Sequence, residues 1–164
     1  MSVRIWRGCL HGLLAGILVV AGSSLAWAQA KDPHYGTWKL NLATSKYSPG
    51  PPPREGTVTI EAAGPGRKVS VTGVAADGTP VTWGYSGNFD GKEIPVTGNN
   101  PDADVVMLKR ISANAIRTTN KKAGKRTLVN GVSVSPDGKT LTVATTGVNA
   151  KGQTVKNTQV FDKQ

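Results

Sequence analysis

The residue types that most often carry catalysis or bind metals are scarce in this chain. His34 is the only histidine beyond residue 28, and Cys9 is the only cysteine. A Ser-His pair, a thiol nucleophile or a metal site with several histidines therefore cannot be assembled. We also expect His34 to lie near a mobile chain terminus, ahead of the first strand. The carboxylates leave one chemistry open, the acid/base pair of a glycoside hydrolase.

The carboxylates do not support that chemistry well. Nothing in the sequence brings any two of Glu55, Glu61 and Glu93 together. Four aspartates stand at predicted turn positions, where the side chain hydrogen-bonds its own backbone; these are Asp77, Asp90, Asp102 and Asp137. We therefore predict that the protein is not an enzyme and has no cofactor and no metal site, with a carboxylate-based hydrolase as the catalytic exception.

The first 28 residues have the pattern of a secretory signal peptide. Arg4 and Arg7 precede an apolar run from residue 12 to 22, and small residues follow up to Ala28. The run is shorter than the ~20 residues that a membrane-spanning helix needs. We expect cleavage to remove Cys9 and to leave one domain, residues 29–164, in a periplasmic or extracellular compartment. We expect no transmembrane segment in that mature chain.

The charge of the mature chain indicates anionic partners. Without Arg4 and Arg7, 18 of the 20 basic residues remain against 10 acidic ones, a net charge of +8. In an exported protein this charge favours lipid headgroups, lipopolysaccharide or acidic glycans over nucleic acid. The segment 109–126 has seven cations and no acid, and four cations stand at its predicted hairpin tip near Ala123-Gly124: Lys121, Lys122, Lys125 and Arg126. A solvated, edge-protecting face is the alternative interpretation.

Period-two alternation of apolar residues recurs along the mature chain, whereas helical spacing is not sustained. Val81, Trp83 and Tyr85 alternate in one segment, and turn dipeptides such as Asp77-Gly78 separate the segments. This pattern predicts an all-β, antiparallel up-and-down meander of about eight to ten strands. The expected spans are 35–42, 57–62, 67–75, 80–87, 93–97, 104–111, 115–122, 125–135, 140–147 and 154–162.

Two longer features interrupt or repeat this pattern. Residues 43–56 contain four prolines and predict a stiff connector across one end of the barrel that these strands would form, with a docking ligand for a partner as the alternative. An offset of 74 residues aligns Val69 with Val143 and Gly73 with Gly147. Duplication of a three-stranded unit and convergence of two similar hairpins both explain this alignment.

The segment Gly36-Thr37-Trp38 at the first predicted strand resembles the G-x-W motif of lipocalins and related calycin barrels. The resemblance implies a closed barrel like those of lipocalins and fatty-acid-binding proteins, in which Gly36 and Trp38 close one end. It also implies a basic residue of the last strand over the indole, and Lys156 is the candidate. The pattern GTWKLN…SKYSPGP is also similar to small secreted bacterial proteins without an assigned function.

The predicted barrel leads to two hypotheses about function. Most inward positions carry small residues, so we expect a partly empty interior that binds a small apolar or amphipathic ligand in a monomer. The candidate lining residues are Trp83, Tyr85, Met107, Leu108 and Phe161. The alternative is a basic interaction module that binds anionic lipid or polysaccharide of the cell envelope through the 109–126 hairpin.

Overall fold

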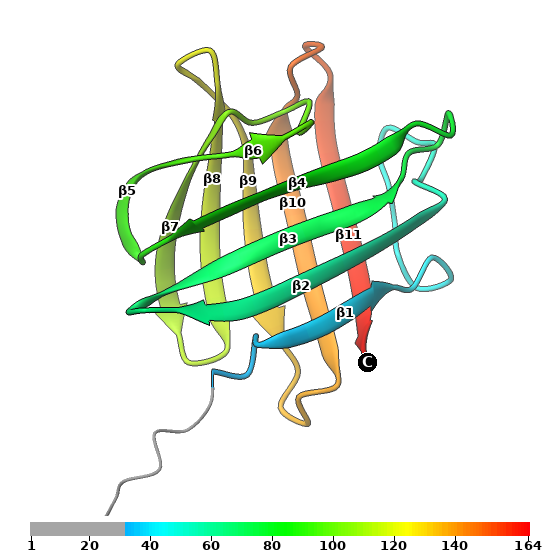
Figure 1. Cartoon of the computed structure of the whole chain (residues 1–164). Coiled ribbons are helices and arrows are strands. Elements are labelled where there is room, and N and C mark those ends of the chain that lie inside the picture. Colours follow the sequence, from blue (N-terminus) through cyan, green and yellow to red (C-terminus); the bar gives the residue numbers. More distant parts are fainter. Residues whose placement is uncertain (1–31) are drawn as a thin grey trace, which may run out of the picture. The chain divides into compact units, whose positions relative to one another are not determined.

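The computed structural model describes residues 32–164, and the predicted signal peptide lies outside the described residues. The alternating segments form antiparallel strands, eleven in the described part of the chain (Figure 1). Their bounds are β1 Gly36–Leu40, β2 Glu55–Ala63, β3 Gly66–Val74, β4 Pro80–Gly87, β5 Asp90–Pro95, β6 Thr97–Gly98, β7 Val105–Ser112, β8 Ala115–Lys122, β9 Lys125–Val134, β10 Thr140–Val148 and β11 Thr154–Lys163.

The strands form one sheet that curls into a nearly closed barrel. Their order is β5-β7-β8-β9-β10-β11-β1-β2-β3-β4-β6. The first and last strands pair, with Trp38 opposite Lys163 and Leu40 opposite Phe161. Figure 1 shows β2, β3 and β4 crossing in front of β8 to β11, so the two layers enclose an interior between them. The predicted meander is confirmed.

The main difference from the predicted strands lies at the edges of the sheet. A single strand was expected over 93–97, but the chain forms β5, which pairs with β7, and then β6, which pairs with β4. Only Val96 separates the two strands. This short segment carries the chain from one edge of the sheet to the other, so the last gap of the barrel is bridged by the continuity of the chain.

The proline-rich connector lies beside the outer part of β11. Beyond Leu40 the first strand ends, and Lys46 takes its place by forming an antiparallel bridge with Thr158. The backbone carbonyl of Ser48 accepts a hydrogen bond from Lys156 at 2.7 Å. The connector thereby satisfies backbone groups of β11 that β1 is too short to reach.

The described strands are all part of this one sheet. No helix in residues 32–164 is long and apolar enough to span a bilayer.

Candidate ligand-binding cavity

The barrel interior contains a cavity of about 340 Å³. This volume lies within the range of small-molecule sites. One wall comes from β2, β3 and β4, and most of its inward residues are apolar: Val58, Ile60, Val69, Val71, Val81 and Trp83. The ring of Trp83 stacks on that of Tyr85 with centroids 6.3 Å apart. The alternation that predicted the strands therefore supplies a continuous apolar surface inside the barrel.

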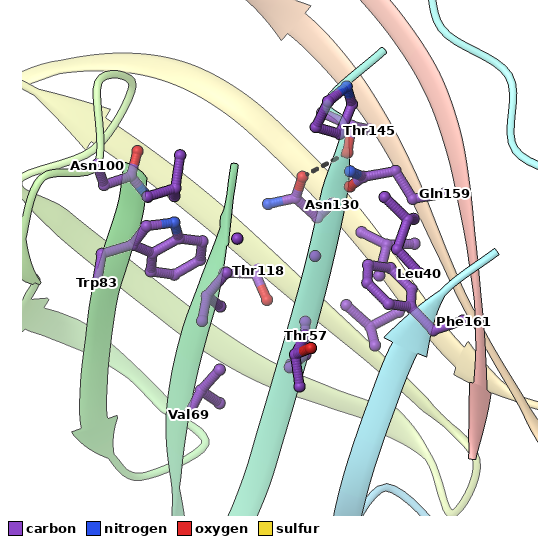
Figure 2. Close-up of a pocket in the computed structure, with 18 of the residues that line it drawn as sticks. Leu40, Thr57, Val69, Trp83, Asn100, Thr118, Asn130, Thr145, Gln159 and Phe161 are labelled. Carbon is purple, nitrogen blue, oxygen red and sulfur yellow. Dashed lines mark hydrogen bonds between the residues drawn. The ribbon is translucent and has the colours of Figure 1, made fainter. Parts of the chain in front are cut away.

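The opposite wall carries hydrogen-bonding side chains at one level. Thr118 of β8 is the cross-strand partner of Asn130 of β9, which pairs with Thr145 of β10, which pairs with Asn157 of β11. All four line the cavity and are named the polar row below. Thr145 Oγ1 donates to Asn130 Oδ1 at 2.8 Å, as Figure 2 shows. Asn130 Nδ2 in turn donates to Asn120 Oδ1 at 3.4 Å.

A buried arginine also lines the cavity. Arg67 of β3 is 2% exposed, and its Nη2 donates to the hydroxyl of Tyr85 at 2.9 Å. Its Nε and Nη1 atoms are buried without a hydrogen-bond partner. Among the described residues, no carboxylate forms an ion pair with this guanidinium. Arg67 is therefore a buried positive charge whose donors are only partly used.

Trp38 seals one end of the barrel. Its side chain is fully buried, and Nε1 donates to the carbonyl oxygen of His34 at 2.9 Å. Lys163 Nζ lies 4.8 Å from the centre of the indole ring. Gly36 leaves room for this lysine, because a Cβ atom there would lie 3.0 Å from Lys163 Cε.

The basic residue over the indole is therefore Lys163, and the expectation for Lys156 was wrong. Lys156 lies near the other end of β11, opposite Thr146, whereas Lys163 is the residue paired with Trp38. The register of the first and last strands decides which lysine reaches the indole, and the sequence does not show this register.

His34 is held in the closed end of the barrel, where the sequence predicted a mobile terminus. It is fully buried, and its Nδ1 lies 2.7 Å from Asp32 Oδ1. Asp32 also accepts a hydrogen bond from Arg110 of β7. Asp32, His34 and Arg110 thus fasten the segment before β1 to a distant strand, and this long-range contact overrides the mobility that a chain end usually has.

Burial and neighbouring charges set the protonation of this cluster. Burial lowers the pKa of His34, the charges of Arg67 and Arg110 lower it further, and Asp32 opposes both. Burial alone raises the pKa of Asp32, but hydrogen bonds from His34 and Arg110 outweigh it and leave that pKa lowered. At neutral pH the imidazole is therefore neutral. Its Nδ1 donates to the carboxylate, and its Nε2 is buried without a partner.

Three of the five predicted lining residues lie at the cavity: Trp83, Tyr85 and Phe161. Met107 and Leu108 do not line it. Neighbouring residues of a strand point to opposite faces, so the two cannot both face the interior. Leu108 points inward but is packed into the core, and Met107 is on the other face of β7. The prediction that both residues line the cavity was therefore wrong.

The basic hairpin turns at Ala123-Gly124 as predicted, but its four tip cations are not equivalent. Lys121 Nζ lies 2.5 Å from Glu93 Oε1, and Lys122 Nζ donates to the carbonyl of Asn100 at 3.3 Å. Lys125 and Arg126 are exposed. Half of the predicted anion-binding cluster is thus engaged with residues of its own chain.

Sequence reasoning missed Arg67 and the polar row. The signal was present for Asn130, because it shares the inward alternation of Leu128 and Val132. Arg67 likewise shares the alternation of Val69 and Val71. A polar or charged residue at an inward position is informative, since such residues are rarely buried without a reason. The described residues contain no group of three histidine, cysteine, aspartate or glutamate side chains placed to hold a metal ion.

Comparisons with known proteins define the fold class. No family model matches the chain, and no curated protein matches it. Among solved structures, zebrafish ileal bile acid-binding protein in complex with cholic acid has a similar fold, with a TM-score of 0.50 and 15% sequence identity. The match covers 80% of this chain and 99% of that one. The fold is a calycin-type barrel, as in lipocalins and fatty-acid-binding proteins.

Proposed function

We propose that this protein is an exported binding protein that holds a small amphipathic anion inside its barrel. The observation that carries the proposal is the cavity of about 340 Å³, which joins an apolar wall to the partly unpaired guanidinium of Arg67. The apolar wall would cover the body of the ligand, and the guanidinium would bind its head group. A barrel of similar fold binds cholic acid, which supports a binding role for this architecture.

Charge balance supports an anionic head group. A buried charge is costly unless it is paired and hydrogen-bonded. The only hydrogen-bond partner of the Arg67 guanidinium is the neutral hydroxyl of Tyr85, and its Nε and Nη1 have none. The guanidinium also lies 5.8 Å and 5.9 Å from the ring centres of Tyr85 and Phe89, but neither ring carries a negative charge. A carboxylate or sulfonate can accept from two guanidinium N–H groups at once and can also accept from the Tyr85 hydroxyl. An anion therefore supplies both the charge and the acceptors that this site lacks.

Export is supported by the sequence of residues 1–28, with its charged start, apolar run and small-residue site. An exported binding barrel meets its ligand outside the cytoplasm. Binding of envelope surfaces through the basic hairpin is less well supported, because Lys121 and Lys122 already contact Glu93 and Asn100.

The test uses two fluorescent probes that differ by one charged group. Anilinonaphthalene sulfonate carries a sulfonate, and phenylnaphthylamine has the same aromatic body without it. We expect the sulfonate probe to bind the mature protein more tightly, and the Arg67→Met variant to weaken its binding by about tenfold or more, because hydrogen bonds to a charged group are involved. Binding of the neutral probe should change little, because methionine preserves the apolar contacts.

Arg126→Met is the matched control, since Arg126 is exposed on the hairpin. It removes the same charge from the surface and should leave the affinity for both probes nearly unchanged in physiological salt. If neither probe binds the wild-type protein, the barrel is not a small-molecule site. If Arg67→Met and Arg126→Met weaken sulfonate binding equally, the attraction comes from the surface charge and the assignment of Arg67 is wrong.

A further inference from the structure

The polar row is the level of its wall with the most hydrogen-bonding side chains. Along β8 to β11, the level on one side of Thr118, Asn130, Thr145 and Asn157 contains Ile116, Val132 and Val143, with Gln159 at its end. The level on the other side contains Asn120, Leu128 and Val155, and both Leu128 and Val155 are paired with Gly147. Hydrogen-bonding groups are thus concentrated at one height of the wall.

The hydrogen bonds within the protein leave part of this row unused. An asparagine side chain has two N–H donors and an oxygen that accepts twice, and a threonine hydroxyl donates once and accepts twice. Thr145 bonds Asn130, and Asn130 bonds Asn120. Asn157 Oδ1 accepts from the backbone N–H of Ser48 at 2.9 Å. The remaining donors and acceptors belong to side chains that line the cavity, so they are available to a ligand or to water.

A plain hydrocarbon body would be poorly matched to this wall. It would displace water from the asparagine and threonine groups without replacing the lost hydrogen bonds. An unsatisfied buried donor or acceptor costs about 1–3 kcal/mol. Sites built to hydrogen-bond a substrate therefore reject analogues that lack the bonding group much more strongly than apolar pockets reject an added group. The opposite wall, by contrast, offers Val71 and Trp83 and accepts hydrocarbon.

We infer that the natural ligand carries a hydroxyl or carbonyl oxygen on its apolar body, away from its anionic head, and that Asn130 and Thr145 select for this oxygen. The inference rests on the proposed function and adds the ligand class: an oxygenated amphipath with one apolar side and one hydrogen-bonding side. Thr145 is buried and Asn130 lies against the cavity, so both contacts are shielded from bulk water and carry specificity.

A stability role alone does not explain this arrangement. Hydrogen-bonded polar pairs in a core are typically matched in stability by apolar residues of similar shape. The same register on β2 to β4 is filled with valine and tryptophan, so the barrel does not need polar residues to close. A polar row with unused donors at a cavity is better explained by what the cavity binds.

The test moves one hydroxyl group along an acyl chain. Saturated fatty acids of one length, unsubstituted or carrying a single hydroxyl at successive carbons, compete with bound phenylnaphthylamine on the mature protein. We expect the affinity to peak at one mid-chain position, about tenfold above that of the unsubstituted acid, and to fall off on both sides. In the double variant Asn130→Leu/Thr145→Val this peak should vanish, while the unsubstituted acid binds as well or better.

Thr146→Val is the matched control, because Thr146 lies on the outer face of β10 next to Thr145, and it should keep the peak. A flat profile in the wild-type protein overturns the inference, and so does a peak that survives in the double variant. If no fatty acid displaces the probe although the probe binds, the inference fails and small-molecule binding stands. If the probe itself does not bind, the proposed function fails first.

Discussion

Two three-stranded units of the barrel, β2–β4 and β9–β11, share their backbone plan but differ in what they present to the cavity. An offset of 74 residues (140 − 66) maps β3 onto β10 from end to end. The turns that follow have the same hydrogen bonds: Ala75 with Thr79 and Gly78 in one unit, and Asn149 with Gln153 and Gly152 in the other. The middle strand and the turn that follows it are therefore common to both units.

The inward side chains at equivalent positions are different. The first unit has apolar or aromatic residues where the second has polar ones: Val71 against Thr145, Trp83 against Asn157, and Tyr85 against Gln159. Turn and strand residues thus determine which positions face inward, and the identity of the residue at each inward position determines what the wall can bind. The architecture and the chemistry of the lining are encoded at separate positions of the same unit.

The largest expected effect tests the shared plan. A Cβ atom at Gly73 would lie 2.5 Å from the carbonyl oxygen of Glu55, and one at Gly147 would lie 2.3 Å from that of Thr127. Gly73→Ala and Gly147→Ala should each lower the free energy of unfolding by about 2–4 kcal/mol, measured by urea denaturation. The loss should be larger for Gly147→Ala, because Gly147 also has a positive φ of 137°, which alanine adopts poorly.

Gly131→Ala is the control for these two variants, because the nearest atom to its Cβ position is 4.0 Å away. Its free energy of unfolding should stay within about 1 kcal/mol of the wild-type value. A Gly73→Ala variant as stable as this control would show that the two units do not share the same close approach of strands.

The next effect tests the difference between the walls. Val71→Thr would place a hydroxyl between Val58 and Trp83, its cross-strand neighbours, which offer no side-chain acceptor. We expect a loss of about 1–3 kcal/mol in the free energy of unfolding. The reciprocal Thr145→Val should cost less, about 0.5–1.5 kcal/mol, because Asn130 keeps its bond to Asn120.

The outward variant Thr72→Val, on an exposed position of β3, serves as control and should change stability by less than about 0.5 kcal/mol. Equal losses for Val71→Thr and Thr145→Val would mean that the two walls tolerate polarity alike, and that the polar row has no special place in the second unit.

The sequence predicted the arrangement of the strands well and the residues that line the cavity poorly. The bounds of β4 and β8 were predicted residue for residue, because alternation and glycine-containing turns are local signals. The split into β5 and β6 was missed, since which edge a short segment joins depends on the rest of the sheet. Arg67 was missed because an arginine in a strand usually indicates a solvent-facing position.

The closed end was predicted in outline only. Trp38 was expected to seal the barrel, and the structure places it fully buried, with a hydrogen bond from its indole N–H to His34. The contacts of Asp32 with Arg110 join residues 78 positions apart, and no local pattern in the sequence announces such a pair. Contacts of this kind become visible only when the strands have been placed.

A smaller effect concerns the charges around His34, one of which, Arg67, belongs to the first unit. The second unit has Leu141 at the equivalent position. The pKa of His34 is lowered in the folded protein, so the unfolded chain binds a proton more readily. The free energy of unfolding should therefore fall as the pH drops below the ordinary histidine value of about 6.5, by at most about 1.4 kcal/mol per pH unit.

Asp32, Arg67 and Arg110 are the charged groups around this imidazole. The pKa of Asp32 is lowered, so its own contribution is lost only at more acidic pH, below the usual aspartate range. Unfolding in urea at pH 7, 6 and 5 measures the effect, and His34→Gln should flatten the profile over this interval. An equally steep profile in the variant would place the titrating group elsewhere.

The smallest effect concerns two contacts between an aromatic ring and a cation, one formed just after β4 and one at the end of β11. Phe89 and Lys163 correspond at the 74-residue offset; the ring of Phe89 lies 4.2 Å from the Arg110 guanidinium, and the Lys163 ammonium lies 4.8 Å from the ring of Trp38. Lys163→Met should lower the free energy of unfolding by about 0.5–1 kcal/mol, the usual range for an exposed cation–π pair.

Lys156→Met removes the same charge from the same strand far from the indole, so it should leave both stability and the fluorescence of Trp38 unchanged. The reverse result, with Lys156 stabilising and Lys163 silent, would contradict the register in which the first and last strands close the barrel.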